Sequence, residues 1–300
     1  MVSREQLDDV FKEEGAALHT YLQNKNRGGA GNSKGNTFEN LFAVYNIAKL
    51  FNSKPRENDN GTFFTSQAKC FVDDLVIKLD KDQTIQHYQL KDVANLSWTN
   101  GNHTIENDFI YQKKLCDSYN ITSELALVVS SRGLALRLEA NIPATIIDFT
   151  KVIIFPTATS VNNLIKTNGL LKDELTNMCA ISNPAADKLE ALCTILLGVW
   201  DSTDKQEITL TNLLNKCYEI NPNYIKGLIN QVSADLANIF GSIKGFTYKI
   251  ENGFIEWQYN NTDDGIISYR IGSAGFIQWE NDIKQSGKIK SFEDLEPFLI

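Results

Sequence analysis

Residues 71–77 read FVDDLVI and residues 87–91 read HYQLK, and these two stretches decide the fold expected for the first half of the chain. Both are rich in β-branched, aromatic and other apolar residues, which favour strands. The polar segment 80–83 between them is typical of a turn. We therefore expect strands over 70–79 and 85–91 that form a hairpin.

Two adjacent carboxylates, Asp73 and Asp74, stand inside the first of these apolar runs. Burying a carboxylate costs free energy unless something compensates its charge, so the pair predicts compensation by a bound metal ion or by Lys91. Side chains alternate along a strand, which places the two on opposite faces and leaves either as the candidate ligand. The position of Asp74 directly before Leu75 favours Asp74.

The second strand carries its own polar pair. Alternation puts Gln89 and Lys91 on one face and Tyr88 and Leu90 on the other. Metal-assisted cleavage of a phosphodiester needs hard oxygen ligands for Mg²⁺ and a cation near the developing negative charge. A hairpin that pairs these residues with Asp74 supplies both, although the same tripeptide on an exposed strand can be a solvated edge.

The segments before the hairpin add further candidates. Ser3 and Gln6 form a capping-box pattern for a helix to about Gln23. The glycine-rich stretch 24–36 is expected to be a flexible loop, in which Arg27 and Lys34 either contact a DNA backbone or belong to a plain connector.

A second helix is expected to begin at Asn36. Glu39 follows three residues later, so it is either a capping-box acid or a residue of the site.

Downstream of the hairpin, Gln112 lies on an expected helix over 105–119 and is either a phosphate contact or ordinary surface polarity. His87 shares the strand face of Gln89 and either lines the cleft or has a structural role. The remaining expected elements are strands at 125–130 and 152–155, helices across 161–200, helices at 210–218 and from Pro222 to Phe240, a hairpin over 246–259, and strands at 266–271 and 276–279.

The stretches FENLFAVYNIAKLF (38–51), FVDDLVI, HYQLKD and LSWTNGNHTIENDFIYQKKL (96–115) resemble the PD-(D/E)XK nuclease superfamily. More narrowly, they are similar to the double-stranded DNA endonuclease domains that act as effectors in bacterial anti-phage systems. The resemblance covers about residues 25–157. It implies an α-β-β-β-α-β core, with a mixed sheet flanked by helices, and a DNA substrate.

The resemblance also implies a site, made of Glu39, Asp74, Gln89 and Lys91, with the backbone carbonyl of Leu90 as a further ligand of Mg²⁺ or Mn²⁺. Gln89 stands where many members of the family have a glutamate, which removes one charged ligand. No proline precedes the aspartate.

The composition is that of a globular α/β protein: 300 residues, 42% hydrophobic and 22% charged. We expect a nuclease-like domain over 1–160, a helical connector over 161–200 and a smaller α+β module over 201–300, with a winged-helix-like alternative for that module. Charged residues near the start exclude a signal peptide or spanning helix, so a cytoplasmic protein with no membrane partner is expected. Five widely spaced cysteines are expected to be reduced thiols.

The chain has a net charge of −8, and its acidic excess is larger toward the C-terminal end. Residues 1–157 hold 17 basic and 19 acidic side chains, whereas residues 201–300 hold 9 and 14. Acidic surfaces repel phosphate, so we expect DNA at the N-terminal part and a protein partner, or a second copy of the chain, at the C-terminal module. Seven aromatic residues support that interface if they are exposed and argue against it if they pack inward: Phe246, Phe254, Trp257, Tyr259, Tyr269, Phe276 and Trp279.

Three functions follow from these patterns. The first is a metal-dependent endonuclease that cuts DNA in anti-phage defence. The second is a non-catalytic scaffold or adaptor that keeps the nuclease fold within a defence complex. The third, a winged-helix regulator, fits least because its recognition helix, Pro222 to Phe240, has only Lys226 as a basic residue.

Overall fold

The computed structural model describes the chain apart from residues 1, 30–32, 54–60, 80–82, 102, 222, 228–230, 252, 288 and 300. For residues 26–29 and 33–36 it describes the backbone alone. The side chains of Arg27 and Lys34 and most of the expected turn at 80–83 therefore lie outside the described residues.

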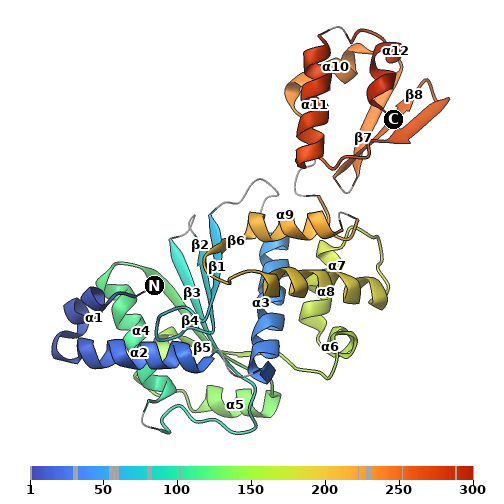
Figure 1. Cartoon of the computed structure of the whole chain (residues 1–300). Helices are drawn as coiled ribbons and strands as arrows, with labels where there is room; N and C mark the ends of the chain where they lie inside the picture. The colour runs from blue at the N-terminus through green and yellow to red at the C-terminus, as the bar shows by residue number, and fades with distance from the viewer. Residues whose placement is uncertain are drawn as a thin grey trace.

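A six-stranded mixed sheet forms the centre of the first part of the molecule, in the order β5-β4-β3-β2-β1-β6 (Figure 1). Strands β1, β2 and β3 are antiparallel neighbours, β4 and β5 run parallel to β3, and β6 pairs antiparallel with β1. The strands are β1 (Thr62–Ser66), β2 (Leu75–Leu79), β3 (Thr84–Lys91), β4 (Thr122–Val129), β5 (Thr150–Ile154) and β6 (Ile208–Thr209).

Helices cover both faces of this sheet. One face packs against α3 (Ser33–Ser53) and a helical group made of α6 (Val161–Thr167), α7 (Gly169–Met178), α8 (Ala186–Ser202) and α9 (Leu210–Ile220). The other face meets α4 (Ile105–Ser118) and α5 (Arg132–Ala140), with α1 (Arg4–Phe11) and α2 (Gly15–Gly29) packed beside α4. Elements α3, β1, β2, β3, α4 and β4 follow one another in the expected α-β-β-β-α-β order.

The alternation expected along β3 is confirmed. Tyr88 and Leu90 lie in the core shared with α3. Gln89 stands opposite Leu127 of β4, whose side chain belongs to the cluster on the α4 face. The sequence pattern therefore gave the correct faces of this strand, and it sends the polar pair toward α4.

The expected hairpin of β2 and β3 is also confirmed, but its first strand is shorter. β2 begins at Leu75, and residues 70–74 form a bent loop that follows a strand, β1, that the sequence did not predict. Backbone bonds fix this loop, with Ala68 N donating to Asp73 O at 3.0 Å. Asp73 and Asp74 thus precede the strand rather than interrupt it.

The helical prediction for the N-terminus needs correction. The capping box of Ser3 and Gln6 is present, but the helix breaks at Lys12, whose φ is 51°, and a 3-10 turn (Lys12–Glu14) leads into α2. α2 continues to Gly29 and α3 begins at Ser33, so the backbone of much of the expected 24–36 loop is helical. Leu18 and Leu22 anchor α2 because both are buried on one side of it.

The buried core of the first part extends beyond the expected boundary at residue 201. β6 pairs with β1, α9 packs on α8, and the cluster of buried residues that contains Phe42 also contains Ile225. Residues 201–225 accordingly belong to the core of the large sheet. They also contact the C-terminal elements, because Arg270 donates to the carbonyl of Ile225 at 3.0 Å and its guanidinium lies 3.2 Å from the centre of the Tyr218 ring.

The C-terminal elements form a separate core (Figure 1). They are α10 (Ala234–Ser242), β7 (Phe246–Glu251), β8 (Phe254–Tyr259), β9 (Asp263–Ile266), α11 (Ala274–Ser286), α12 (Phe292–Leu295) and a 3-10 turn (Glu296–Phe298). The hairpin of β7 and β8 is confirmed, and β9 joins its β8 edge.

Several predictions in this region are wrong. The helix expected from Pro222 begins at Ala234, because Ile225 forms an isolated bridge with Cys179 and residues 231–233 are not helical. This removes the recognition helix of the winged-helix alternative. Residues 276–279 lie in α11 rather than a strand, since Phe276, Trp279 and Ile283 are buried at helical spacing. Only the first residue of the expected strand 266–271 is in β9.

Most of the seven C-terminal aromatics pack inward. Phe246, Phe276 and Trp279 are buried, and Trp257 and Tyr259 pack partly buried against the same core. Tyr269, at 45% exposed, is the clear exception. The inward-packing alternative therefore holds for most of the set. Among the described residues, no helix is long and apolar enough to cross a membrane.

Candidate functional site

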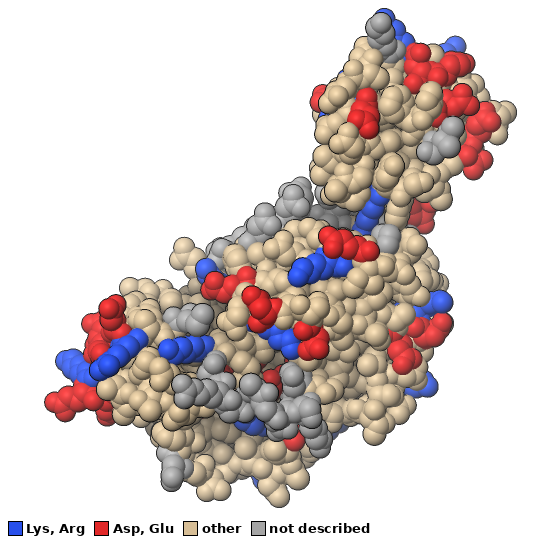
Figure 2. All heavy atoms as spheres, in the orientation of Figure 1, with Lys and Arg blue, Asp and Glu red and all other residues tan. Residues whose placement is uncertain are grey.

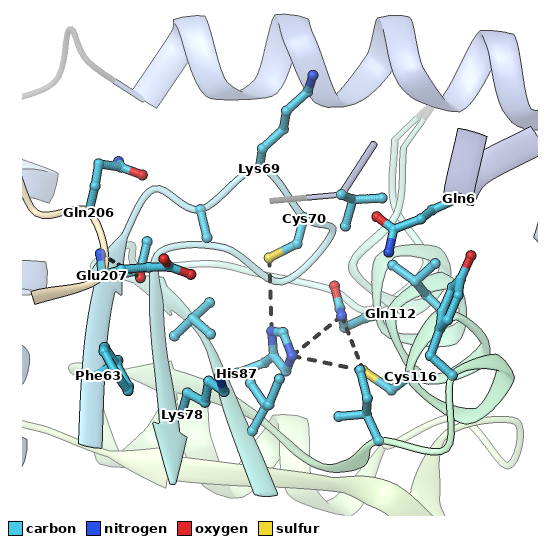
Figure 3. Close-up of a pocket in the computed structure, with 18 residues that line it drawn as sticks. Gln6, Phe63, Lys69, Cys70, Lys78, His87, Gln112, Cys116, Gln206 and Glu207 are labelled. Atoms are coloured by element: carbon cyan, nitrogen blue, oxygen red, sulfur yellow. Dashed lines mark hydrogen bonds between the residues drawn. The ribbon is translucent and has the colours of Figure 1, made fainter. Parts of the chain in front are cut away.

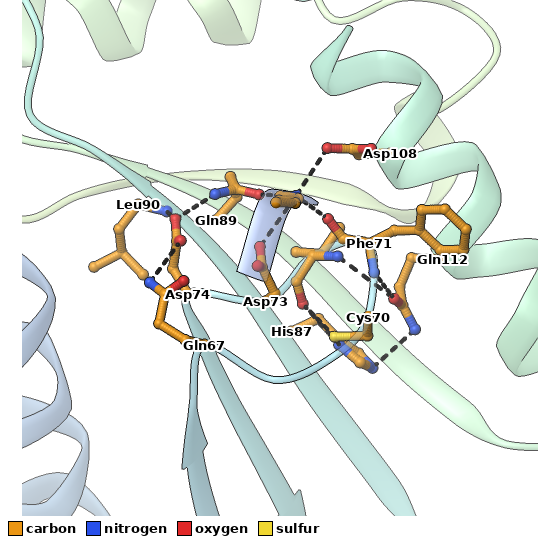
Figure 4. A network of polar contacts seen from close by, with 12 residues as sticks. Gln67, Cys70, Phe71, Asp73, Asp74, His87, Gln89, Leu90, Asp108 and Gln112 are labelled. Atoms are coloured by element: carbon orange, nitrogen blue, oxygen red, sulfur yellow. Dashed lines mark hydrogen bonds and ion pairs between the residues drawn. The ribbon is translucent and has the colours of Figure 1, made fainter. Parts of the chain in front are cut away.

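The candidate site lies where the loop before β2 meets the end of β3. Asp74 is buried there, and its Oδ2 accepts hydrogen bonds from the backbone N–H of Leu90 at 2.7 Å and from the amide of Gln89 (Figure 4). The ammonium of Lys91 lies 3.4 Å from the same oxygen. Three neighbouring residues of one strand thus converge on a single carboxylate.

Glu39 reaches this cluster from α3 through a residue that the sequence reasoning missed. The amide nitrogen of Gln67 donates to Glu39 Oε2 at 2.9 Å and to Asp74 Oδ1 at 3.2 Å. Burial, and then the charge of Asp74, raise the pKa of Glu39 to about 7. Because α3 begins at Ser33, Glu39 is not at the capping position, which makes the capping-box interpretation wrong.

The backbone of Leu90 is open to the site because β2 pairs with β3 only up to Tyr88, opposite Leu75. In a strand, the N–H and C=O of one residue point to the same side. Since the N–H of Leu90 binds Asp74, its carbonyl faces the same edge. This is the carbonyl expected as a metal ligand.

Asp73 has a different environment from Asp74. Its Oδ1 lies 3.0 Å from the ammonium of Lys25, which also lies 2.9 Å from Asp108 Oδ2. The hydroxyl of Tyr21 donates to Asp108 at 2.9 Å. Burial lowers the pKa of Lys25, but Asp73 and Asp108 outweigh burial and raise it well above its usual value. Asp73 therefore belongs to a buried ion pair, and Asp74 is the carboxylate of the candidate site.

Lys25 also fixes the orientation of Gln89. Its ammonium lies 3.1 Å from Gln89 Oε1, whereas Gln89 donates its amide nitrogen to Asp74. A lysine has only donors and an ionised carboxylate only acceptors, so this orientation satisfies both neighbours. The amide oxygen of Gln89, expected as a metal ligand, points toward Lys25 and away from Asp74.

The donor set can be compared with the needs of a divalent cation. Glu39, Asp74 and the Leu90 carbonyl offer the hard oxygen atoms that Mg²⁺ and Mn²⁺ prefer. Burial, and second the charge of Asp74, raise the pKa of Glu39, and a nearby cation would act in the opposite direction. Among the described residues, however, no group of three or more His, Cys, Asp or Glu side chains could hold a metal ion, so a site here would depend on the Leu90 carbonyl as well.

Gln112 is not a phosphate contact. Its side chain is buried, and its Oε1 accepts from Phe71 N at 3.0 Å, so it supports the loop that carries the aspartates. His87 is equally structural: it lies 3.1 Å from the carbonyl of Val72, and burial lowers its pKa to about 4. The structural role of His87 is therefore supported, whereas the burial of Gln112 contradicts its interpretation as ordinary surface polarity.

A pocket of about 370 Å³ opens beside these two residues on the same face of the sheet (Figure 3). Cys70, His87 and Cys116 lie at its base, and Lys69 and Lys78 are among its polar lining residues. Burial raises the pKa of both thiols, which disfavours the reactive thiolate form.

Comparisons of this chain with protein-family models, with curated proteins and with solved structures found no match.

Proposed function

We propose that this chain is a metal-dependent nuclease of the PD-(D/E)XK type that cleaves DNA with Mg²⁺ or Mn²⁺. The observation that carries the proposal is the convergence of Leu90 N–H, Gln89 and Lys91 on Asp74, with Glu39 joined to the same carboxylate through Gln67. The order of elements from α3 to β4 supports it because that is the core implied by the family resemblance.

In the proposed reaction, Asp74, Glu39 and the Leu90 carbonyl hold the cation. A bound divalent cation polarises a phosphodiester and lowers the pKa of an attacking water. Lys91 has the exposure needed to meet substrate, since 36% of its side chain is accessible, and its ammonium offsets negative charge that develops on the phosphate. Lys25 holds the loop of Asp73 against α4 and keeps this geometry in place.

The C-terminal unit is assigned to protein binding, with a partner or with a second copy of the chain. Acidic side chains gather on the upper right of this unit in Figure 2, and residues 231–300 carry 10 acidic against 6 basic side chains. Such a surface repels the DNA backbone at ordinary salt. A role in anti-phage defence rests on the family resemblance alone.

A non-catalytic scaffold is the second candidate function. The orientation of Gln89 favours it, because the amide nitrogen and not the oxygen faces Asp74. The net charge of −8 favours it as well. For a scaffold, the polar cluster around Asp74 would only stabilise the fold and would bind no metal.

Plasmid cleavage separates the two functions. Purified protein is incubated with supercoiled DNA and Mg²⁺ or Mn²⁺, with and without EDTA. The nuclease proposal expects nicked or linear DNA that EDTA prevents. Intact plasmid under every metal condition, from protein with a cooperative unfolding transition, supports the scaffold.

A further inference from the structure

Gln67 occupies an unusual position in the backbone. It follows β1 with a φ of 51°, in the left-handed region that side chains other than glycine rarely adopt. Eight other described non-glycine residues also have a positive φ, and Gln67 is the one among them whose side chain contacts Asp74. Its own N–H lies 3.4 Å from the carbonyl of Asp74, so the backbone of Gln67 is tied to the candidate ligand.

The side chain of Gln67 stands between two carboxylates. Its single amide nitrogen contacts Glu39 Oε2 at 2.9 Å. The same nitrogen contacts Asp74 Oδ1 at 3.2 Å (Figure 4). Glu39 comes from α3 and Asp74 from the loop before β2, so this amide joins two elements that otherwise present like charges to each other. A neutral N–H donor here takes the place that a cation would fill between the two acids.

We propose that Gln67, and not Gln89, supplies the side-chain amide oxygen to the cation, an inference that rests on the proposed nuclease function. A half-turn of the terminal amide exchanges Nε2 and Oε1 with little change in shape. Without a cation, the nitrogen faces Glu39 and Asp74 and is attracted to both. With a cation between the acids, the oxygen in the same place would become a further hard ligand beside Glu39, Asp74 and the Leu90 carbonyl.

The contact of Gln89 with Lys25 opposes a half-turn of the Gln89 amide. Its oxygen accepts from Lys25 at 3.1 Å, and a half-turn would place the amide N–H groups against that ammonium. Lys25 is itself fixed by Asp73 and Asp108 at 3.0 and 2.9 Å. The buried ion pairs therefore hold Gln89 with its nitrogen toward Asp74.

The test is Mn²⁺ binding to the full chain in the absence of DNA, measured by calorimetry and by the electron paramagnetic resonance signal of free Mn²⁺. We compare the parent with Gln67→Met, Gln67→Glu and Gln89→Met. We expect Gln67→Met to weaken Mn²⁺ binding by about tenfold or more, Gln89→Met to weaken it less, and Gln67→Glu to tighten it.

The opposite ranking overturns the inference. If Gln67 only separates the two acids, Gln67→Met removes a competitor of the cation and Mn²⁺ binds as tightly as to the parent or more tightly. If Gln67→Met does not fold, Gln67→Glu decides, because equal or weaker binding contradicts a ligand role.

The Asp74→Ala variant separates this inference from the proposed function. A parent that binds Mn²⁺ no better than Asp74→Ala overturns both. A parent with Asp74-dependent binding that Gln67→Met leaves intact overturns the role of Gln67 alone.

Discussion

The two cores of this protein differ in what they bury. Around the loop before β2, the first core encloses Asp73, Asp74, Asp108 and Gln89 together with the ammonium of Lys25. Among the described residues of the C-terminal unit, Arg270 is the one charged side chain that is buried, and the rest of that core is aliphatic and aromatic.

This difference indicates that the charged side chains buried in the first core are not there for stability. Buried ion pairs rarely stabilise a fold more than apolar packing of the same volume would. The C-terminal unit shows that this chain can build a core from aromatic contacts such as Phe240 with Phe246, whose ring centroids are 5.1 Å apart. The concentration of buried charge where the loop before β2 meets the end of β3 therefore supports our proposal that the functional site lies there.

The largest effect is expected from the residues that the proposed chemistry uses. Asp74→Ala and Lys91→Ala should each reduce DNA cleavage by about 10²-fold or more, because one removes a ligand and the other a cation near the phosphate. Cleavage rates with Mg²⁺ are compared with that of Lys113→Ala, whose lysine pairs with Asp117 on α4.

Equal cleavage by all three variants would show that the site is misplaced. If Asp73→Ala is inactive while Asp74→Ala is active, the choice between the two aspartates is wrong and the site stands.

The second effect concerns stability. Lys25→Met should lower the free energy of unfolding by about 3–5 kcal/mol, because it leaves Asp73 and Asp108 buried without their partner. Lys113→Met breaks a more exposed pair and should cost less than about 1 kcal/mol. Urea denaturation measures both, and similar losses for the two lysines would show that the buried ion pairs of Lys25 contribute no more than an exposed pair.

A third effect is the pH dependence of stability due to His87. The pKa of the buried His87 is about 4, below its ordinary value of 6.5, so the unfolded chain binds a proton more readily. Its contribution is fully present above pH 6.5 and is lost as the pH falls toward 4, by on the order of 3 kcal/mol. His87→Gln should show a shallower acid loss in urea denaturation between these pH values. The same slope as the parent would mean that His87 is not buried as a neutral ring.

The smallest effect is expected on the surface of the C-terminal unit. Ile277, on α11, is 51% exposed, so Ile277→Ser should change the free energy of unfolding by less than about 0.5 kcal/mol. Ile283, on the same helix, is 1% exposed and serves as the matched control, since Ile283→Ser empties part of the core. A large loss from Ile277→Ser would reveal an interface or packing role for this face.

Local patterns were enough to predict much of the first part of the fold. Alternation over residues 88–91 gave the faces of β3, and the apolar period over 105–118 gave α4. The run Phe71–Ile77 misled because its composition suits a strand, while the backbone of Asp73 and Asp74 is fixed by Ala68 and Gln67 in a loop. The helix over Phe276–Trp279 was missed because a short aromatic run fits either period.

Local patterns also predicted part of the candidate site. Asp74, Gln89 and Lys91 lie within two short segments, so strand pairing alone brought them together. Lys25 and Gln67 were missed because their partners are distant in sequence or depend on an unusual φ. One signal for Lys25 was available, since it continues the buried stripe of Leu18 and Leu22 on α2.

Anomalous diffraction from crystals soaked in Mn²⁺ tests the metal site most directly. The account predicts a manganese peak within coordination distance of the carboxylates of Glu39 and Asp74, and loss of that peak in Asp74→Ala crystals. A protein that cleaves DNA with Mn²⁺ but whose crystals show the metal bound only elsewhere, or no peak beside Asp74 at saturating Mn²⁺, would contradict it.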